Sequence, residues 1–78
     1  MINVKVLGSG CANCQRLEAT VRKVVEARSL SAEIEKVTDY AEIMKWSILS
    51  TPGLVVNGKL VSAGRIPTEA EIVYWLAE

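Results

Sequence analysis

The chain has 78 residues, 50% of them hydrophobic, and its nine basic side chains balance nine acidic ones. A chain of this length forms one small domain, residues 1–78, with enough apolar material for a sheet covered by helices. The absence of net charge argues against nucleic acid and anionic membranes as partners. No apolar run reaches the ~20 residues of a membrane span, and no signal peptide opens the chain, so we expect a cytoplasmic monomer.

The first half of the sequence predicts a strand, a helix and a second strand. Residues 2–7 alternate between apolar and polar side chains and are rich in β-branched residues, and the glycine-rich turn 8–10 ends that strand. Residues 32–37 alternate again and predict the second strand. Between them, an apolar stripe at three- and four-residue spacing predicts a helix: Leu17, Val21, Val24 and Val25.

A second helix and a hairpin should follow. Asp39 and Glu42 form a pair like a capping box, which opens a helix that Thr51-Pro52-Gly53 must end. Asn57-Gly58 lies between two apolar segments and is a strong hairpin signal, because both residues tolerate positive φ. The second helix should bury a stripe made of Tyr40, Ile43, Met44, Ser47 and Ile48.

The last element should be a helix. Thr68 and Glu71 have the spacing of a capping box and precede the apolar side chains Ile72, Val73, Trp75 and Leu76. We expect the side chains of Tyr74 and Trp75 to serve in the packing of this helix. The predicted order is therefore βαβαββα, an α/β fold with a four-stranded mixed sheet flanked by three helices. The first two strands should be parallel through a right-handed crossover.

The chemistry centres on the two cysteines, Cys11 and Cys14, which are separated by Ala12-Asn13. A disulfide can close across this spacing at the start of a helix without unwinding it. The helix N-terminus stabilises a thiolate, so Cys11 should be the nucleophile and the more buried Cys14 the resolving thiol. The chain has no histidine, which excludes Cys-His catalysis.

Three groups of residues carry a family resemblance: residues 8–14, Thr51-Pro52-Gly53 before a hairpin, and the terminal helix. They resemble the thioredoxin/glutaredoxin superfamily, and most closely the small prokaryotic redox-active disulfide proteins, or glutaredoxin-like thioredoxins. The resemblance covers the whole chain and implies a thioredoxin-like domain that acts as a thiol-disulfide oxidoreductase in electron transport. Its partners would be a disulfide-containing target protein and a thioredoxin-reductase-like or other electron donor, and it needs no cofactor.

In that family the proline is cis and faces the CxxC motif, and the preceding residue pairs with substrate through its backbone. The resemblance therefore implies that Pro52 follows a cis peptide bond and that Thr51 binds substrate. Thioredoxins also carry a buried acidic residue near the second cysteine. The first strand here offers none, which leaves Glu33 or Glu35 as a weak substitute.

Other interpretations of these residues remain open. Two thiolates at a helix start also resemble a Cu(I) chaperone, although that fold runs βαββαβ and ends in a strand. A non-catalytic interaction module would survive the loss of both cysteines. Trp46 fits half-buried packing better than a docking surface. Arg65 could steer an anionic substrate such as glutathione, although a solvated charge is the more common role of such a residue.

Overall fold

The computed structural model describes residues 2–8, 12–46 and 51–77. Its sheet has the strand order β2-β1-β3-β4, in which β1 pairs parallel with β2 and antiparallel with β3, and β3 pairs antiparallel with β4. The predicted order βαβαββα is confirmed. The elements are β1 (Ile2–Leu7), α1 (Ala12–Ala27), β2 (Ala32–Val37), α2 (Tyr40–Met44), β3 (Gly53–Val56), β4 (Lys59–Ala63) and α3 (Glu69–Leu76).

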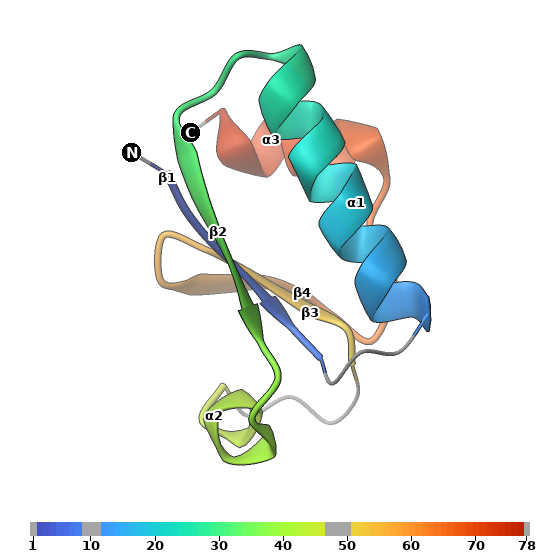
Figure 1. The fold of residues 1–78 in the computed structure, drawn as a ribbon, viewed down its shortest axis with the longest axis vertical. Helices are drawn as coiled ribbons and strands as arrows, with labels where there is room; N and C mark the ends of the chain where they lie inside the picture. The colour runs from blue at the N-terminus through green and yellow to red at the C-terminus, as the bar shows by residue number, and fades with distance from the viewer. Residues whose placement is uncertain (1, 9–11, 47–50, 78) are drawn as a thin grey trace.

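The larger core lies between the sheet and the pair of helices α1 and α3, which cover the same face (Figure 1). Alternate residues of a strand point to opposite faces, so Val4 and Val6 of β1 enter this core. The predicted stripe of α1 faces them, with Leu17, Val21 and Val24 buried and Val25 partly buried. None of the described helices is long and apolar enough to cross a membrane.

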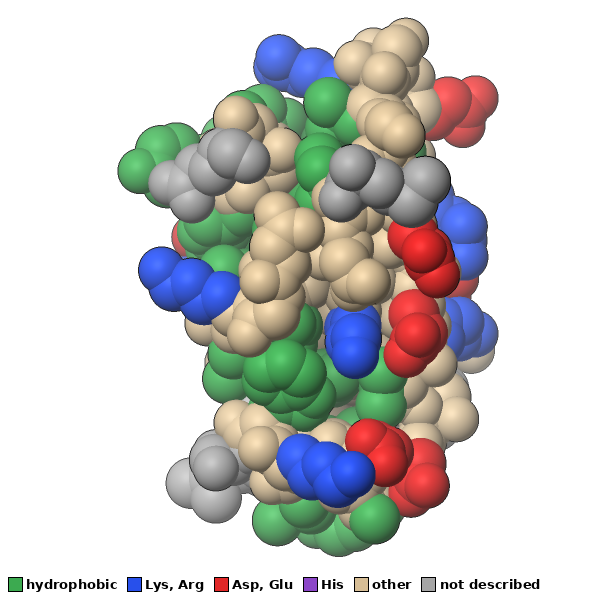
Figure 2. Space-filling view, turned by 90° about the vertical axis from the view of Figure 1, so that its left-hand side faces the viewer, with side chains coloured by type: hydrophobic (Ala, Val, Ile, Leu, Met, Phe, Trp, Pro, Cys, Tyr) green, Lys and Arg blue, Asp and Glu red, His purple; other side chains and the backbone are tan. Residues whose placement is uncertain are grey.

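The opposite face of the sheet is covered in part by α2, whose Ile43 packs with Leu7, Val37 and Val55. The predicted stripe of this helix is wrong at two positions, because Tyr40 is 71% and Met44 is 45% exposed. The helix has five residues, and Ile43 is the one among them that is buried. The other two predicted positions, Ser47 and Ile48, lie outside the described residues. Figure 2 shows this side of the molecule, where charged and hydrophobic side chains lie next to one another.

Trp46 is half-buried against the Ile43 cluster, in agreement with the packing role expected for it. The ammonium group of Lys5 lies 5.9 Å from the centroid of its ring. Lys5 is on the central strand β1, so this cation-π contact links the end of α2 to the middle of the sheet.

Local sequence signals set the turns and caps. Asn57 and Gly58 adopt φ values of 51° and 81°, as a type I′ hairpin turn requires. Asp39 caps α2 by accepting a hydrogen bond from the Ala41 amide, whereas Glu42 pairs with Lys45 and completes no capping box. Thr68 and Glu71 form the full capping box of α3. Tyr74 of that helix is 66% exposed, so its predicted packing is wrong, while Trp75 is half-buried.

Glu71 also binds Arg65, whose guanidinium donates to both carboxylate oxygens at 3.0 and 2.8 Å. These hydrogen bonds, followed by that from the Thr68 amide, lower the pKa of Glu71 to about 2. A carboxyl whose pKa is lowered by folding stabilises the protein at pH values above the pKa that it has in the unfolded chain. This stability is lost as the pH falls toward the pKa that the carboxyl has in the folded protein. Glu71→Gln should therefore be less stable than the parent at pH 7, and its stability should fall less between pH 5 and pH 2.

Urea unfolding at a series of pH values measures this effect. Glu33→Gln is the matched control, because it removes an exposed carboxylate from β2 that has no ion pair among the described residues. The control should keep the parent's acid profile. Parallel acid profiles for the parent and Glu71→Gln would contradict the role assigned to the Arg65–Glu71 pair.

Candidate redox site

Cys14 lies in the first turn of α1 and is 5% exposed. It is disulfide-bonded. The sequence holds one other cysteine, Cys11, and this predicted nucleophile lies outside the described residues. The structure therefore places the predicted resolving thiol at a helix N-terminus, buried as expected.

Gly8 is the residue that brings α1 close to the end of β1. A methyl group built on Gly8 would overlap Cys14 Sγ, and it would lie 3.0 Å from Cys14 Cβ and 3.8 Å from Thr51 Cβ. Any side chain at this position would therefore collide with the cysteine. The sequence indicated Gly8 as part of a turn and of the family motif in residues 8–14, whereas the structure shows that it also lies in contact with Cys14.

The segment that carries Thr51 and Pro52 completes the site. The Thr51–Pro52 peptide bond is cis, the geometry that the resemblance implied. Pro52 is fully buried, whereas Thr51 is exposed and lies beside Gly8. The amide of Gly64 donates a hydrogen bond to the Pro52 carbonyl at 2.9 Å, which anchors this segment to the end of β4. The expected contact between Pro52 and Cys11 falls outside the described residues.

These groups meet at one end of the sheet. Leu7 pairs with Gly53, and Gly53 pairs with Ala63, so the residues that follow β1, precede β3 and follow β4 lie next to one another. The amide of Gly8 donates to the Val37 carbonyl at 3.0 Å, which adds the end of β2 to the same group. The ends of the four strands therefore form one group, and Cys14 packs against one member of it, Gly8.

The charged residues suggested from the sequence are exposed or already paired. Glu33 and Glu35 are exposed on β2, so neither replaces the buried acidic residue of thioredoxins. Arg65 is held by Glu71, and this bidentate ion pair occupies the guanidinium considered above for an anionic substrate. Along α1, the half-buried carboxylate nearest to Cys14 belongs to Glu18, one turn further on, which no sequence signal had singled out.

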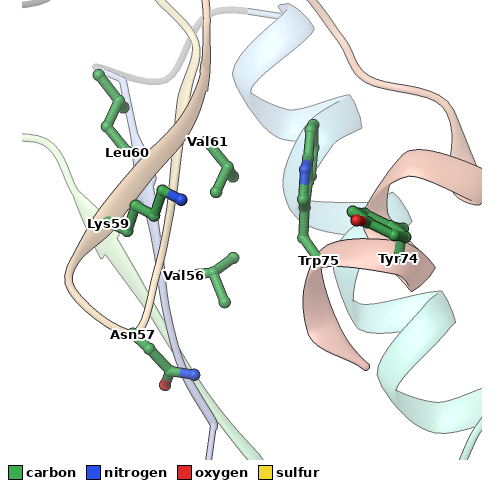
Figure 3. A pocket seen from close by; sticks show the side chains of 7 residues that line it. All are labelled: Val56, Asn57, Lys59, Leu60, Val61, Tyr74 and Trp75. Carbon is green, nitrogen blue, oxygen red and sulfur yellow. The ribbon is translucent and has the colours of Figure 1, made fainter. Parts of the chain in front are cut away.

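A hollow of about 480 Å³ lies far from the cysteine, between the hairpin and α3 (Figure 3). It lies near the Asn57-Gly58 turn, at the opposite end of β3 from Pro52. Its lining contains no cysteine and no carboxylate, so it offers no redox chemistry. The lining residues are Val56, Asn57, Lys59, Leu60, Val61, Tyr74 and Trp75.

Within residues 2–8, 12–46 and 51–77, no group of three or more histidine, cysteine, aspartate or glutamate side chains could hold a metal ion. The fold also ends in a helix, α3, whereas the Cu(I) chaperone arrangement weighed from the sequence ends in a strand.

The sequence of the chain is similar to those of known thioredoxins. A thioredoxin domain family model matches residues 2–77. A thioredoxin of Methanothermobacter thermautotrophicus is 38% identical over 72 residues, which cover 92% of this chain and 94% of the relative. A thioredoxin of Methanocaldococcus jannaschii is 39% identical over 72 residues, covering 92% of this chain and 83% of the relative.

A solved structure has the same fold. The crystal structure of the germline-specific thioredoxin protein Deadhead from Drosophila melanogaster superposes with a TM-score of 0.68 at 18% identity, covering 97% of this chain and 78% of that chain. At this identity the superposition speaks for the fold alone, and the two archaeal thioredoxins support a thiol-disulfide redox role in general. Together with the match along nearly its whole length, these relatives show that the chain belongs to the thioredoxin family.

Proposed function

We propose that the chain is a cytoplasmic, monomeric thiol-disulfide oxidoreductase that uses Cys11 and Cys14 to reduce disulfides in target proteins. The observation that carries this proposal is the buried, disulfide-bonded Cys14 at the start of α1, held against Gly8 and beside Thr51. The thioredoxin relatives support disulfide substrates and a reductase or other electron donor as the partners.

The reaction has two exchange steps. The Cys11 thiolate attacks one sulfur of the substrate disulfide, a bond forms between these sulfurs, and the other substrate sulfur leaves as a thiolate. The Cys14 thiolate then attacks the Cys11 sulfur and displaces the second substrate sulfur. Two electrons pass to the substrate, and the cysteine pair is left oxidised. A thioredoxin-reductase-like or other dithiol donor returns the two electrons.

Thr51 is proposed to hold the substrate during both steps. It is exposed, whereas the neighbouring Pro52 is buried and bound through its carbonyl to Gly64. An extended substrate segment can pair with the Thr51 backbone as a short added strand. Because the proline has no amide N–H, it cannot donate a competing hydrogen bond at this point.

A redox titration tests the proposal. The purified protein is equilibrated in glutathione or dithiothreitol buffers of graded potential, and free thiols are counted by the mass added on alkylation. We expect a single two-electron transition between zero and two labelled cysteines, and catalysis of insulin reduction by dithiothreitol. Absence of catalysis above the rate with dithiothreitol alone would contradict the proposed function.

A further inference from the structure

The hollow between the hairpin and α3 joins an apolar floor to a wall of aromatic side chains. Val56 of β3 belongs to the larger core and Val61 of β4 packs against it, and both side chains lie on the side of the hairpin that faces Trp75 (Figure 3). Trp75 packs against the same core and is half-buried. Its neighbour Tyr74 is 66% exposed. Part of the apolar surface that lines the hollow is therefore open to water.

The polar groups of the lining are mainly hydrogen-bond donors, and one of them is a cation. Lys59 is exposed and has no ion pair with any described residue, and its ammonium lies on the side of the hairpin that faces α3 (Figure 3). Asn57 Oδ1 accepts a hydrogen bond of 2.9 Å from the Asn3 amide, which leaves the side-chain NH2 group to donate. No carboxylate is among the described lining residues.

Three other hollows among the described residues lack this combination. Two of them, of about 440 and 270 Å³, include the Glu26 carboxylate in their lining. The third, of about 250 Å³ beside Arg28, has no aromatic side chain, and it is smaller than the ~300–1,000 Å³ of typical small-molecule sites. The hollow at Lys59, of about 480 Å³, lies within that range and has an unpaired cation among aromatic side chains.

We propose that this hollow binds a small aromatic carboxylate, one or two fused rings that carry a single carboxylate group. The rings contact Trp75 and Tyr74 in the offset or edge-to-face geometry that aromatic pairs prefer, and they cover Val56 and Val61. The carboxylate accepts a charge-assisted hydrogen bond from the Lys59 ammonium, the stronger kind of hydrogen bond. This site is separate from the redox site, because it lies at the opposite end of β3 from Pro52.

The charge of the lining argues against a second copy of the chain as the occupant. In a twofold dimer each molecule presents the same residues to the other, so two Lys59 ammonium groups would come together. The described lining residues include no carboxylate that could balance them. Like charges that face one another across an interface oppose its formation. A small anion supplies the charge that the lining lacks.

Titration of the oxidised protein with naphthoate, a two-ring carboxylate, tests the proposal. Heteronuclear NMR of the isotope-labelled protein follows the backbone amides and the two tryptophan indole groups. We expect saturable shifts concentrated in residues 56–61 and 74–75, including the Trp75 indole N–H. The Trp46 indole packs with the smaller cluster on the opposite face of the sheet and should not move. Naphthalenemethanol, which has the same rings and no charge, should bind about fivefold more weakly.

Two substitutions of exposed residues separate the contribution of the charge from that of the rings. Lys59→Gln should weaken naphthoate binding by about fivefold and leave naphthalenemethanol binding unchanged. Tyr74→Ala should weaken the binding of both compounds by about threefold, because it removes one aromatic contact. Arg16→Gln is the matched control, since it removes an exposed cation of α1 that has no ion pair with a described residue. The control should change neither affinity.

Three results would overturn the proposal: equal binding of the two compounds, an effect of Lys59→Gln no larger than that of Arg16→Gln, or shifts spread over the surface without saturation. The variants alter exposed side chains, and parent-like amide spectra before titration establish that each is folded. The titration needs no thiol exchange, so its outcome is independent of the insulin assay. Failure of that assay removes the proposed redox function, and failure of the titration removes only the carboxylate site.

Discussion

Replacement of Cys14 by serine should slow the catalysed reduction of insulin by on the order of 100-fold or more, while Cys11 still attacks the substrate. The resolving thiol is tethered next to the mixed disulfide, so its effective concentration far exceeds that of any thiol in solution. Without it, each mixed disulfide waits for an external thiol. The Cys14→Ser protein should accumulate as a mixed disulfide with a peptide substrate, visible as an added mass under non-reducing conditions.

Cys11→Ser is the matched control, because it removes one sulfur and keeps the other. The remaining Cys14 is 5% exposed, so a substrate disulfide cannot reach it easily. This variant should be as inactive as Cys14→Ser but should trap little substrate. Equal trapping by both variants, or retention of turnover by Cys14→Ser, would reverse or remove the roles assigned to the two thiols.

The elements that the sequence predicted well are those set by local interactions. The alternation of residues 2–7 and 32–37 predicted β1 and β2. The Asn57-Gly58 dipeptide predicted the hairpin turn. The pair Thr68 and Glu71 predicted the start of α3. Each signal lies within a few residues of the structure it specifies. The same holds for Cys14, whose position at a helix start follows from its neighbours in the chain.

The features that sequence reasoning missed depend on long-range packing. Tyr40 and Met44 match a helical stripe, but α2 has five residues and buries Ile43 alone among them, so both are exposed. The Glu18–Lys36 pair joins residues from a helix and a strand whose relative orientation no local pattern specifies. The available signal was a glutamate, Glu18, four residues after the predicted resolving cysteine, a spacing that places both on one face of a helix.

The contact of Gly8 with Cys14 is another feature that the local sequence could not predict. A glycine after a strand is typical of a turn, and nothing in the neighbouring sequence says that a sulfur atom will occupy the place of its side chain. That contact depends on how closely the first turn of α1 approaches the end of β1. The family resemblance indicated which segments form the site, and the packing shows which atoms touch.

Gly8→Ala should lower the free energy of unfolding by about 1–3 kcal/mol, the usual cost of an extra methyl group in a packed interior. The new Cβ would overlap Cys14 Sγ, so either α1 or β1 must move. A Gly-to-Ala change also restricts the unfolded chain, which by itself would stabilise the protein by about 0.4–1 kcal/mol. The collision is the larger effect, so we expect net destabilisation in urea unfolding, together with slower insulin reduction.

A double-mutant cycle isolates the sulfur as the cause. Gly8→Ala is introduced into the parent and into a Cys14→Ala protein, and each is compared with its own background. Without Sγ the closest contact of the new methyl group would be Cys14 Cβ at 3.0 Å, which a small shift can relieve. Most of the penalty should therefore disappear in the Cys14→Ala background. An equal penalty in both backgrounds would show that the cost arises from another neighbour of Gly8, and that the close approach to Cys14 does not limit this position.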